Sequence, residues 1–126
     1  MKPTFSPATD IALKIPSHEH EAMVRLYRDV FGFKLLRTSE DGKSIAFEFG
    51  SMTLWLDSVA ALSQAEIWLE INTGDLASAQ SALAEAGCVI RNEVEQLPEG
   101  FEAFWVSTPS NLIHLVSKSD PQPPGD

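Results

Sequence analysis

The alternation of apolar and polar residues near the N-terminus predicts one compact structural unit, residues 10–36. Residues alternate from Asp10 to Ile15, and a period of two is typical of a half-buried strand. Ser17 is a plausible N-cap for the helix that follows. The apolar residues of that helix recur at helical spacing: Met23, Leu26, Tyr27, Val30 and Phe31. Gly32 stands where a helix can end in a left-handed conformation, and a second strand follows.

The same order of features recurs about 56 residues later in the chain. Residues 66–71 alternate as a strand does. Thr73 or Asp75 can cap the next helix, and Gly87 stands at its end. Few residues are identical between the two copies, but strand, helix and glycine keep a nearly constant offset. The pattern therefore indicates an internal repeat.

Turn residues divide the rest of each copy into three further strands. An Asp-Gly pair at residues 41–42 predicts a hairpin. The predicted strands are 33–38, 44–49 and 52–57 in the first copy, and 88–90, 101–106 and 112–117 in the second. The loop at 91–100 is longer than the corresponding turn, and long loops often cover a binding site. Each copy therefore reads as βαβββ, and the predicted fold class is α+β.

The two copies predict a single domain at residues 9–117, made of module one (9–57) and module two (65–117). We expect residues 1–8 to form a flexible leader. The proline-rich tail, 118–126, is expected to be disordered. Because one helix covers only one face of each sheet, the two sheets are predicted to form a curved, incomplete barrel with an uncovered concave side.

Alternation along the predicted strands assigns side chains to the two faces. The faces toward the helices receive apolar residues: Ile11, Leu13, Ile15, Leu54, Leu56, Ile67, Leu69, Ile71, Ile113 and Leu115. The concave side receives a mixed set: Asp10, Ala12, Lys14, Thr53, Trp55, Asp57, Glu66, Trp68, Glu70, Leu112, His114 and Val116.

Composition narrows the class of protein. The chain has 126 residues, 44% of them hydrophobic, and a net charge of −9. No apolar run is long enough for a membrane span, and the N-terminus lacks the apolar core of a signal peptide. The acidic surface would repel phosphate backbones, so we expect no nucleic-acid partner. The single cysteine, Cys88, excludes an internal disulfide and fits a reducing compartment, so a cytoplasmic location is expected.

Two short motifs resemble those of the vicinal oxygen chelate superfamily, which includes glyoxalase I, bleomycin-resistance proteins and extradiol dioxygenases. RLYRDVFGF resembles the family's FYxxxLGF at Leu26-Tyr27 and Phe31-Gly32-Phe33. TPSNLIHL resembles the family's DPxGNxxEL at Pro109, Asn111 and Leu115. With the paired βαβββ modules, the resemblance covers residues 9–117. It implies the fold described above more specifically than it implies a reaction.

The resemblance also implies four metal-ligand positions on strands facing the concave side. They carry Asp10, Trp55, Glu66 and His114 in this chain. Trp55 cannot bind a metal, which leaves Asp10, Glu66 and His114 as a candidate triad for Zn, Ni, Mn or Fe. Such an ion could polarise a bound carbonyl or enediolate. The alternative is that no metal is bound, because the usual four-point chelate is incomplete.

The concave side also reads as an acidic, tryptophan-lined cup for a small molecule. Trp55 and Trp68 face inward by alternation, whereas the sequence leaves the orientation of Trp105 open. Four carboxylates accompany them: Asp10, Asp57, Glu66 and Glu70. Together these suit an aromatic or cationic ligand through stacking and cation–π contacts. Equally, the tryptophans could simply fill a small barrel or a dimer seam.

Other reactive side chains have simpler explanations. His18 and His20 lie two residues apart at a helix start, so they point in different directions and are expected to be solvated rather than to share an ion. Cys88 follows the helix-ending glycine and is expected to be a packed thiol. No catalytic triad order, phosphate loop or dinucleotide fingerprint is present.

Three functional interpretations follow from these residues. The first is a binding protein resembling the bleomycin-resistance branch, which sequesters an aromatic or cationic compound without a cofactor. The second is a metal-dependent lyase or isomerase resembling glyoxalase I. The third is a structural or accessory dimer without a ligand. The resemblance also implies a homodimer, with no nucleic-acid or membrane partner.

Overall fold

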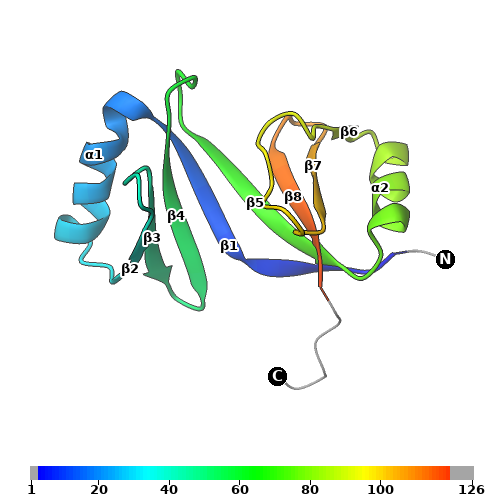
Figure 1. Ribbon diagram of the computed structural model, residues 1–126, viewed down its shortest axis with the longest axis horizontal. Helices are drawn as coiled ribbons and strands as arrows, with labels where there is room; N and C mark the ends of the chain where they lie inside the picture. Colours follow the sequence, from blue (N-terminus) through cyan, green and yellow to red (C-terminus); the bar gives the residue numbers. More distant parts are fainter. Residues whose placement is uncertain (1–2, 120–126) are drawn as a thin grey trace. The chain divides into compact units, whose positions relative to one another are not determined.

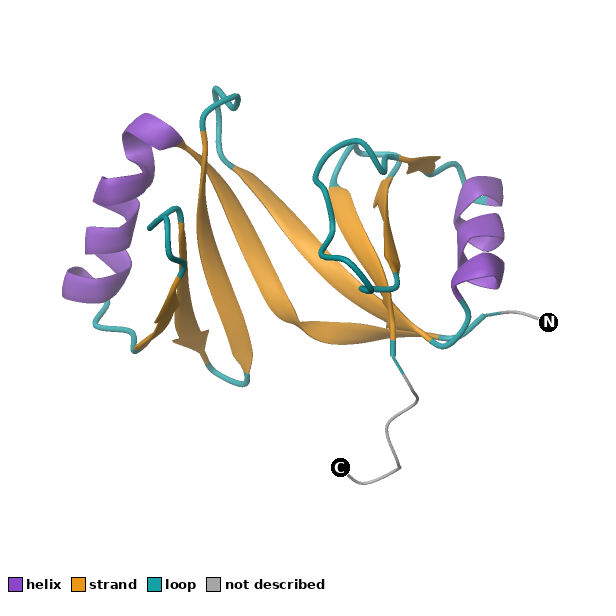
Figure 2. Ribbon diagram, in the orientation of Figure 1, coloured by secondary structure: helices purple, strands orange, loops and turns teal. Residues whose placement is uncertain are grey.

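The computed structural model describes residues 3–119 as two compact units. The N-terminal unit is Thr9–Trp68, and the C-terminal unit joins residues 3–8 to residues 69–119. Each unit combines one α-helix with a small sheet (Figures 1 and 2). No helix within residues 3–119 has the length and apolar character needed to cross a membrane.

The N-terminal unit has strand order β2-β3-β4-β1. Its elements are β1 (Phe5–Pro16), α1 (Ser17–Arg25), the π-helical turn η1 (Leu26–Val30), β2 (Leu35–Thr38), β3 (Ser44–Phe49) and β4 (Met52–Val59). β1 and β4 are parallel, with Ile11 opposite Leu54, and the other two pairs are antiparallel. These strands match the predicted ones closely, apart from a late start of β2 and extensions of β1 and β4.

The core of this unit lies between α1 and one face of its sheet. The buried members are Ile15, Ile45, Phe47, Leu54 and Leu56, with Ile11, Leu13, Met23, Val24, Tyr27 and Phe33 packed against them. They include the odd-numbered positions of β1 and the even-numbered positions of β4 that alternation assigned to the helix side. The prediction for this sheet is confirmed, so the opposite face carries the polar set.

The helix begins one residue earlier than predicted. Pro16 is the N-cap, and Ser17 is the first helical residue, so the prediction of Ser17 as N-cap is wrong. Its hydroxyl instead accepts a hydrogen bond from the Ser58 hydroxyl at 3.0 Å. At the other end, the Phe31 N–H donates to the Leu26 carbonyl at 2.9 Å, and Gly32 follows with a φ of 72°. A positive φ is accessible to glycine at little cost, which explains why the helix ends there.

The C-terminal unit repeats the arrangement with strand order β5-β8-β7-β6. Its elements are β5 (Glu66–Thr73), α2 (Leu76–Glu85), β6 (Val89–Ile90), β7 (Ala103–Ser107) and β8 (Ile113–Lys118). Asp75 caps α2 by accepting a hydrogen bond from the Ser78 N–H at 3.1 Å, as one of the two predicted caps. Gly87 ends the helical segment with a φ of 96°. The α+β prediction, with two βαβββ units, is confirmed.

The core of the C-terminal unit shows that the face assignment of β8 was wrong. Ala79 of α2 packs with Phe104, Val106 and Val116, so the even-numbered residues of β8 face the helix. The sequence had assigned Ile113 and Leu115 to that face. A register difference of one residue exchanges the two faces of a strand, and both sets of β8 residues are mostly apolar.

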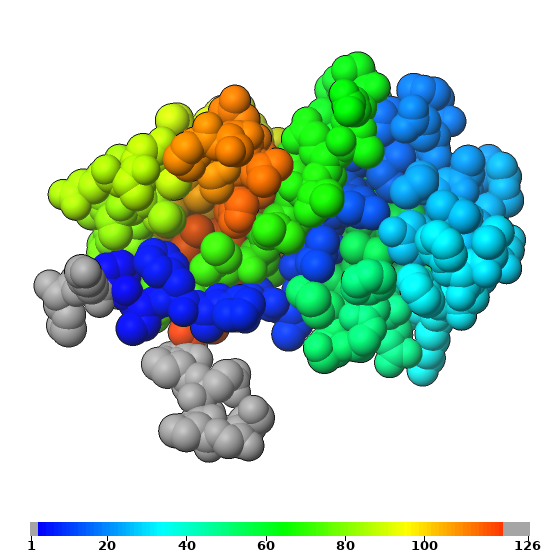
Figure 3. Space-filling view, turned by 180° about the vertical axis from the view of Figure 1, so that it is seen from behind, coloured from blue at the N-terminus to red at the C-terminus, as the bar shows by residue number. Residues whose placement is uncertain are grey.

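The segment expected to be a flexible leader contains the start of β1. The strand begins at Phe5, and the Thr4 carbonyl accepts a hydrogen bond from the Thr73 hydroxyl at 2.9 Å. Figure 3 shows these first residues, in dark blue, packed along the C-terminal unit. At the other end, Lys118 is still in β8, and the rest of the predicted disordered tail beyond Ser119 lies outside the described residues.

Candidate ligand-binding face

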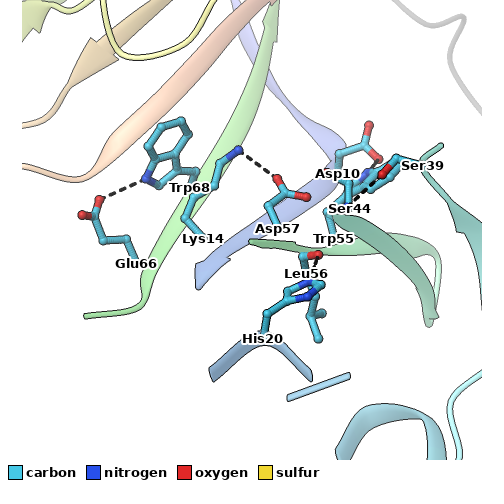
Figure 4. A network of polar contacts seen from close by, with 10 residues as sticks. All are labelled: Asp10, Lys14, His20, Ser39, Ser44, Trp55, Leu56, Asp57, Glu66 and Trp68. Carbon is cyan, nitrogen blue, oxygen red and sulfur yellow. Dashed lines mark hydrogen bonds and ion pairs between the residues drawn. The ribbon is translucent and has the colours of Figure 1, made fainter. Parts of the chain in front are cut away.

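The face of the N-terminal sheet opposite α1, together with the first residues of β5, carries a set of polar and aromatic side chains, which we call the tryptophan face. Its members are Asp10, Lys14, Arg37, Trp55, Asp57, Glu66 and Trp68. Figure 4 shows most of them pointing toward one another from neighbouring strands. Six of the seven were assigned to the concave side from the sequence, and Arg37 was not.

Trp55 is held in place by Asp10. Its indole N–H donates a hydrogen bond to Asp10 Oδ1 at 3.2 Å, between the adjacent strands β4 and β1. Ala12 and Ala46 flank Trp55 in the pairing register and leave room for its ring. The contact fixes the rotation of the indole, so its plane is oriented before any ligand arrives.

Trp68 is held in the same way by a carboxylate. Its indole N–H donates to Glu66 Oε1 at 3.0 Å, two residues earlier on β5. The ammonium group of Lys14 lies 4.5 Å from the centroid of the Trp68 ring, which is a cation–π contact. Both tryptophans that the sequence placed on the inner side therefore use a neighbouring acid as an acceptor.

Lys14 and Asp57 form an ion pair on the same face. Lys14 Nζ lies 2.8 Å from Asp57 Oδ2, and the two side chains are only 6% and 16% exposed. The other carboxylate oxygen, Asp57 Oδ1, is buried and has no hydrogen-bond partner within the described residues. Part of the predicted acidity of this face is therefore neutralised by a lysine of the same sheet.

Arg37 is a member that sequence reasoning missed. Its guanidinium carbon lies 5.2 Å from the centroid of the Trp55 ring. Arg37 pairs with Ala46, which in turn pairs with Trp55, so all three share a face. The register of β2 against β3 shifts between Leu35 and Arg37, and such a bulge changes the alternation of side chains. A strict period of two along β2 cannot anticipate that shift.

Two predicted site residues lie on the C-terminal unit and on opposite faces of its sheet. Glu70 pairs with Leu115 and accepts a hydrogen bond from the Ser117 hydroxyl at 2.7 Å. His114 pairs with Val106 and Leu69, and therefore lies on the face that packs against α2. Its Nδ1 atom is 3.2 Å from the Leu112 carbonyl oxygen. His114 is thus not on the face of this unit that carries Glu70.

A metal centre finds little support in this geometry. Among residues 3–119, no group of three or more His, Cys, Asp or Glu side chains could hold a metal ion. Asp10 and Glu66 each accept an indole N–H, and His114 lies on the helix-covered face of its sheet. The triad of Asp10, Glu66 and His114 stays a prediction, and the position of His114 counts against it.

Trp105 connects the long loop of the C-terminal unit to strand β7 through hydrogen bonds. It pairs with Leu115, so its side chain lies on the face away from α2, and it is only 5% exposed. Its indole N–H donates to the Glu95 carbonyl at 2.9 Å, and its backbone N–H donates to Asn92 Oδ1 at 2.9 Å. The loop between β6 and β7, drawn in teal in Figure 2, is therefore tied to the sheet through this tryptophan.

The histidine pair at the start of α1 divides into two environments. His18 is 76% exposed, as expected of a solvated first turn. His20 is buried instead, and its Nε2 atom lies 2.9 Å from the Leu56 carbonyl oxygen (Figure 4). Because a carbonyl can only accept, Nε2 carries the proton of this hydrogen bond. His20 therefore anchors α1 to β4 and has a structural role.

A surface hollow of about 620 Å³ lies elsewhere on the N-terminal unit. Its lining residues are Gly32, Phe33, Lys34, Glu48, Phe49 and Gly50. The volume falls within the range of about 300–1,000 Å³ that is common for ligand pockets. None of the lining residues belongs to the tryptophan face, so the two features are distinct.

The fold of this chain is similar to that of several solved structures. The Mn(II)-bound glyoxalase from Novosphingobium aromaticivorans matches with a TM-score of 0.67 at 17% identity, over 92% of this chain and 40% of that protein. A variant of homoprotocatechuate 2,3-dioxygenase from Brevibacterium fuscum matches with a TM-score of 0.62 at 18% identity, over 95% and 34% respectively. The chain has a glyoxalase/dioxygenase-like fold.

The resemblance that the two motifs indicated is thereby confirmed at the level of the fold, since both enzymes belong to the vicinal oxygen chelate superfamily. A hypothetical protein from Bacillus halodurans has a similar size. It matches with a TM-score of 0.64 at 12% identity, over 95% of this chain and 98% of that one. The chain spans less than half the length of the two enzymes. No family model matches the sequence, and no curated protein matches it.

Proposed function

We propose that the chain binds a planar aromatic small molecule on its tryptophan face and does not convert it chemically. The observation that carries this proposal is the pairing of each indole with its own carboxylate, Trp55 with Asp10 and Trp68 with Glu66. A ring whose orientation is already fixed loses little conformational entropy when a ligand stacks on it. Aromatic stacking then contributes in addition to the burial of apolar area.

The same contacts make a purely cationic ligand less suitable than the sequence indicated. Lys14 already lies over the Trp68 ring and neutralises Asp57, and Arg37 lies over the Trp55 ring. Asp10 and Glu66 are engaged by the indole N–H groups. Of the two ligand classes considered, the structure therefore favours the aromatic one.

Isothermal titration calorimetry with naphthamide, a neutral planar probe, tests this proposal. We expect saturable binding to the unmodified protein and a loss of about tenfold or more in affinity for Trp55→Leu, since base–aromatic and ring–ring stacking contribute on the order of 1–3 kcal/mol. Phe31→Leu is the matched control, because Phe31 is an exposed aromatic ring of the same unit that does not belong to the tryptophan face. If naphthamide does not bind, or if Trp55→Leu and Phe31→Leu reduce its affinity equally, the proposal is wrong.

A metal-dependent lyase or isomerase remains the second candidate, because one structural neighbour is a Mn(II)-bound glyoxalase. The triad of Asp10, Glu66 and His114 fits an ion poorly. Asp10 and Glu66 each accept an indole N–H, and His114 lies on the face that packs against α2. Metal analysis of protein purified without chelator would decide between the two functions. A stoichiometric ion that is lost in His114→Ala would favour the enzyme.

The homodimer implied by the resemblance is a separate proposal and is compatible with either function. Sedimentation velocity of the purified chain measures its mass in solution directly. A dimer that binds none of the aromatic probes would instead favour a structural or accessory role.

A further inference from the structure

Arg37 differs from every other arginine of the chain in its partners. The sequence has 18 acidic residues against 9 basic ones, so an arginine finds an acidic neighbour easily. Three arginines do so: Arg25 pairs with Glu21, Arg28 with Asp29, and Arg91 with Glu93. Within residues 3–119, the Arg37 guanidinium has no hydrogen-bond or ion-pair partner. Its positive charge makes a cation–π contact with the Trp55 ring.

The position of this guanidinium is set by two features of the sheet. The shift of register between β2 and β3 directs Arg37 to the face that carries Trp55. The Trp55 ring is itself fixed by Asp10, and the guanidinium carbon lies 5.2 Å from its centroid. A guanidinium in a cation–π contact still has N–H donors that can bind a planar anion in bidentate geometry.

The charges around Arg37 select the sign of the ligand. Asp10 accepts the Trp55 N–H and Asp57 is paired with Lys14, and neither carboxylate forms an ion pair with Arg37. A cationic ligand beside Trp55 would meet the positive charge of Arg37 directly. A ligand with a carboxylate would provide the missing partner while its ring contacts the indole.

We propose that the ligand of the tryptophan face is an aromatic carboxylate, with Arg37 binding the carboxylate and Trp55 supporting the ring. This inference rests on the proposed function, because it assumes that the face binds a planar aromatic compound. It adds the charge of that compound and names Arg37 as the residue that determines specificity. The carboxylate of the ligand determines which aromatic compounds are preferred, and the aromatic ring of the ligand determines that they bind at Trp55.

Three probes of the same shape separate charge from stacking: naphthoate is anionic, naphthamide is its neutral counterpart, and naphthylmethylamine is cationic. By calorimetry at low salt, we expect naphthoate to bind about tenfold more tightly than naphthamide, the ratio typical of one charge-assisted bidentate contact near a surface. Naphthylmethylamine should bind more weakly than either. The preference for naphthoate should decrease as salt is added, because an exposed ion pair is screened.

Substitution of Arg37 tests its role without removing the aromatic platform. Arg37→Gln should abolish the difference in affinity between naphthoate and naphthamide, whereas Arg37→Lys should keep only part of that difference. Arg28→Gln is the matched control, because it removes a positive charge of the same unit that already has an acidic partner. Thermal unfolding of each variant confirms that it is folded.

The outcomes distinguish this inference from the function on which it rests. If naphthoate and naphthamide bind the unmodified protein equally, the inference fails and the proposed function stands. The inference also fails if Arg37→Gln strengthens all three probes alike, since Arg37 would then merely cover Trp55. If none of the probes binds, both the inference and the proposed function are wrong.

Discussion

Lys14 and Asp57 lie opposite each other on the parallel strands β1 and β4, and their charged groups are 2.8 Å apart. Both side chains are largely withdrawn from solvent, and the lysine also lies over the Trp68 ring. An ion pair at this depth gains from Coulomb attraction but loses hydration, so its net contribution is small while the cost of breaking it is large. Breaking the pair should therefore disturb the tryptophan face, to which both residues belong.

Removing one partner of this pair should destabilise the fold strongly. Asp57→Leu removes the carboxylate that lies 2.8 Å from the buried Lys14 ammonium group, and we expect a loss of about 3 kcal/mol in the free energy of unfolding. The double variant Lys14→Met with Asp57→Leu should recover part of that loss, because the buried ammonium group is removed together with the carboxylate. Urea unfolding measures both values. Equal stability of the single and double variants would show that the pairing does not matter.

Asp10 should control the orientation of Trp55 more than the stability of the chain. Asp10→Ala removes the acceptor of the indole N–H, which we expect to cost about 1 kcal/mol in unfolding free energy. It should also reduce naphthamide affinity, because the ring is no longer held. Near-UV circular dichroism in a variant with Trp68 and Trp105 replaced by Phe reports on Trp55 alone. Asp10→Asn, which keeps an acceptor oxygen, is the control and should change both quantities less.

The two histidines of α1 should respond very differently to substitution. His20→Ala removes the donor to the Leu56 carbonyl and leaves a small cavity, so we expect a loss of about 2 kcal/mol. His18 is exposed, and His18→Ala should change stability by no more than about 0.5 kcal/mol. Chemical denaturation of the two variants side by side checks this difference. Equal effects would contradict the structural role of His20.

Asp75 should make the stability of the C-terminal unit depend on acid pH. Hydrogen bonds from Ser78, above all from its backbone N–H, hold the pKa of Asp75 below its usual value. A depressed carboxyl pKa stabilises the folded state above the unfolded pKa of about 4, and this contribution is lost as the pH falls through the folded pKa. Asp75→Ala should therefore lower the Tm near neutral pH, and the difference from the unmodified protein should shrink in acid.

The control for this experiment is Asp75→Asn, which can still accept at the helix N-terminus but does not titrate. Its Tm difference from Asp75→Ala should stay nearly constant between neutral and acid pH. Differential scanning calorimetry over a pH series measures both. A difference between Asp75→Ala and the unmodified protein that grows in acid would contradict the assigned sign.

The sequence by itself determined the elements, the repeat and one of the two cores. Alternation placed Ile11, Leu13 and Ile15 on the helix side of β1, because a strand buried on one face must keep its apolar residues at every second position. Gly32 and Gly87 marked the helix ends, because a positive φ is cheap only for glycine. Such local rules act over a few residues, so they can be read directly from the sequence.

Only the tertiary structure decided the contacts of the candidate site. The register of β8 turned His114 toward α2, and a bulge turned Arg37 toward Trp55. The pairings of Asp10 with Trp55 and of Lys14 with Asp57 join residues more than forty positions apart. Strand register is set by the packing of the whole sheet, and a slip of one residue exchanges its faces. Composition could therefore predict an acidic, aromatic surface, but not which charge on it lacks a partner.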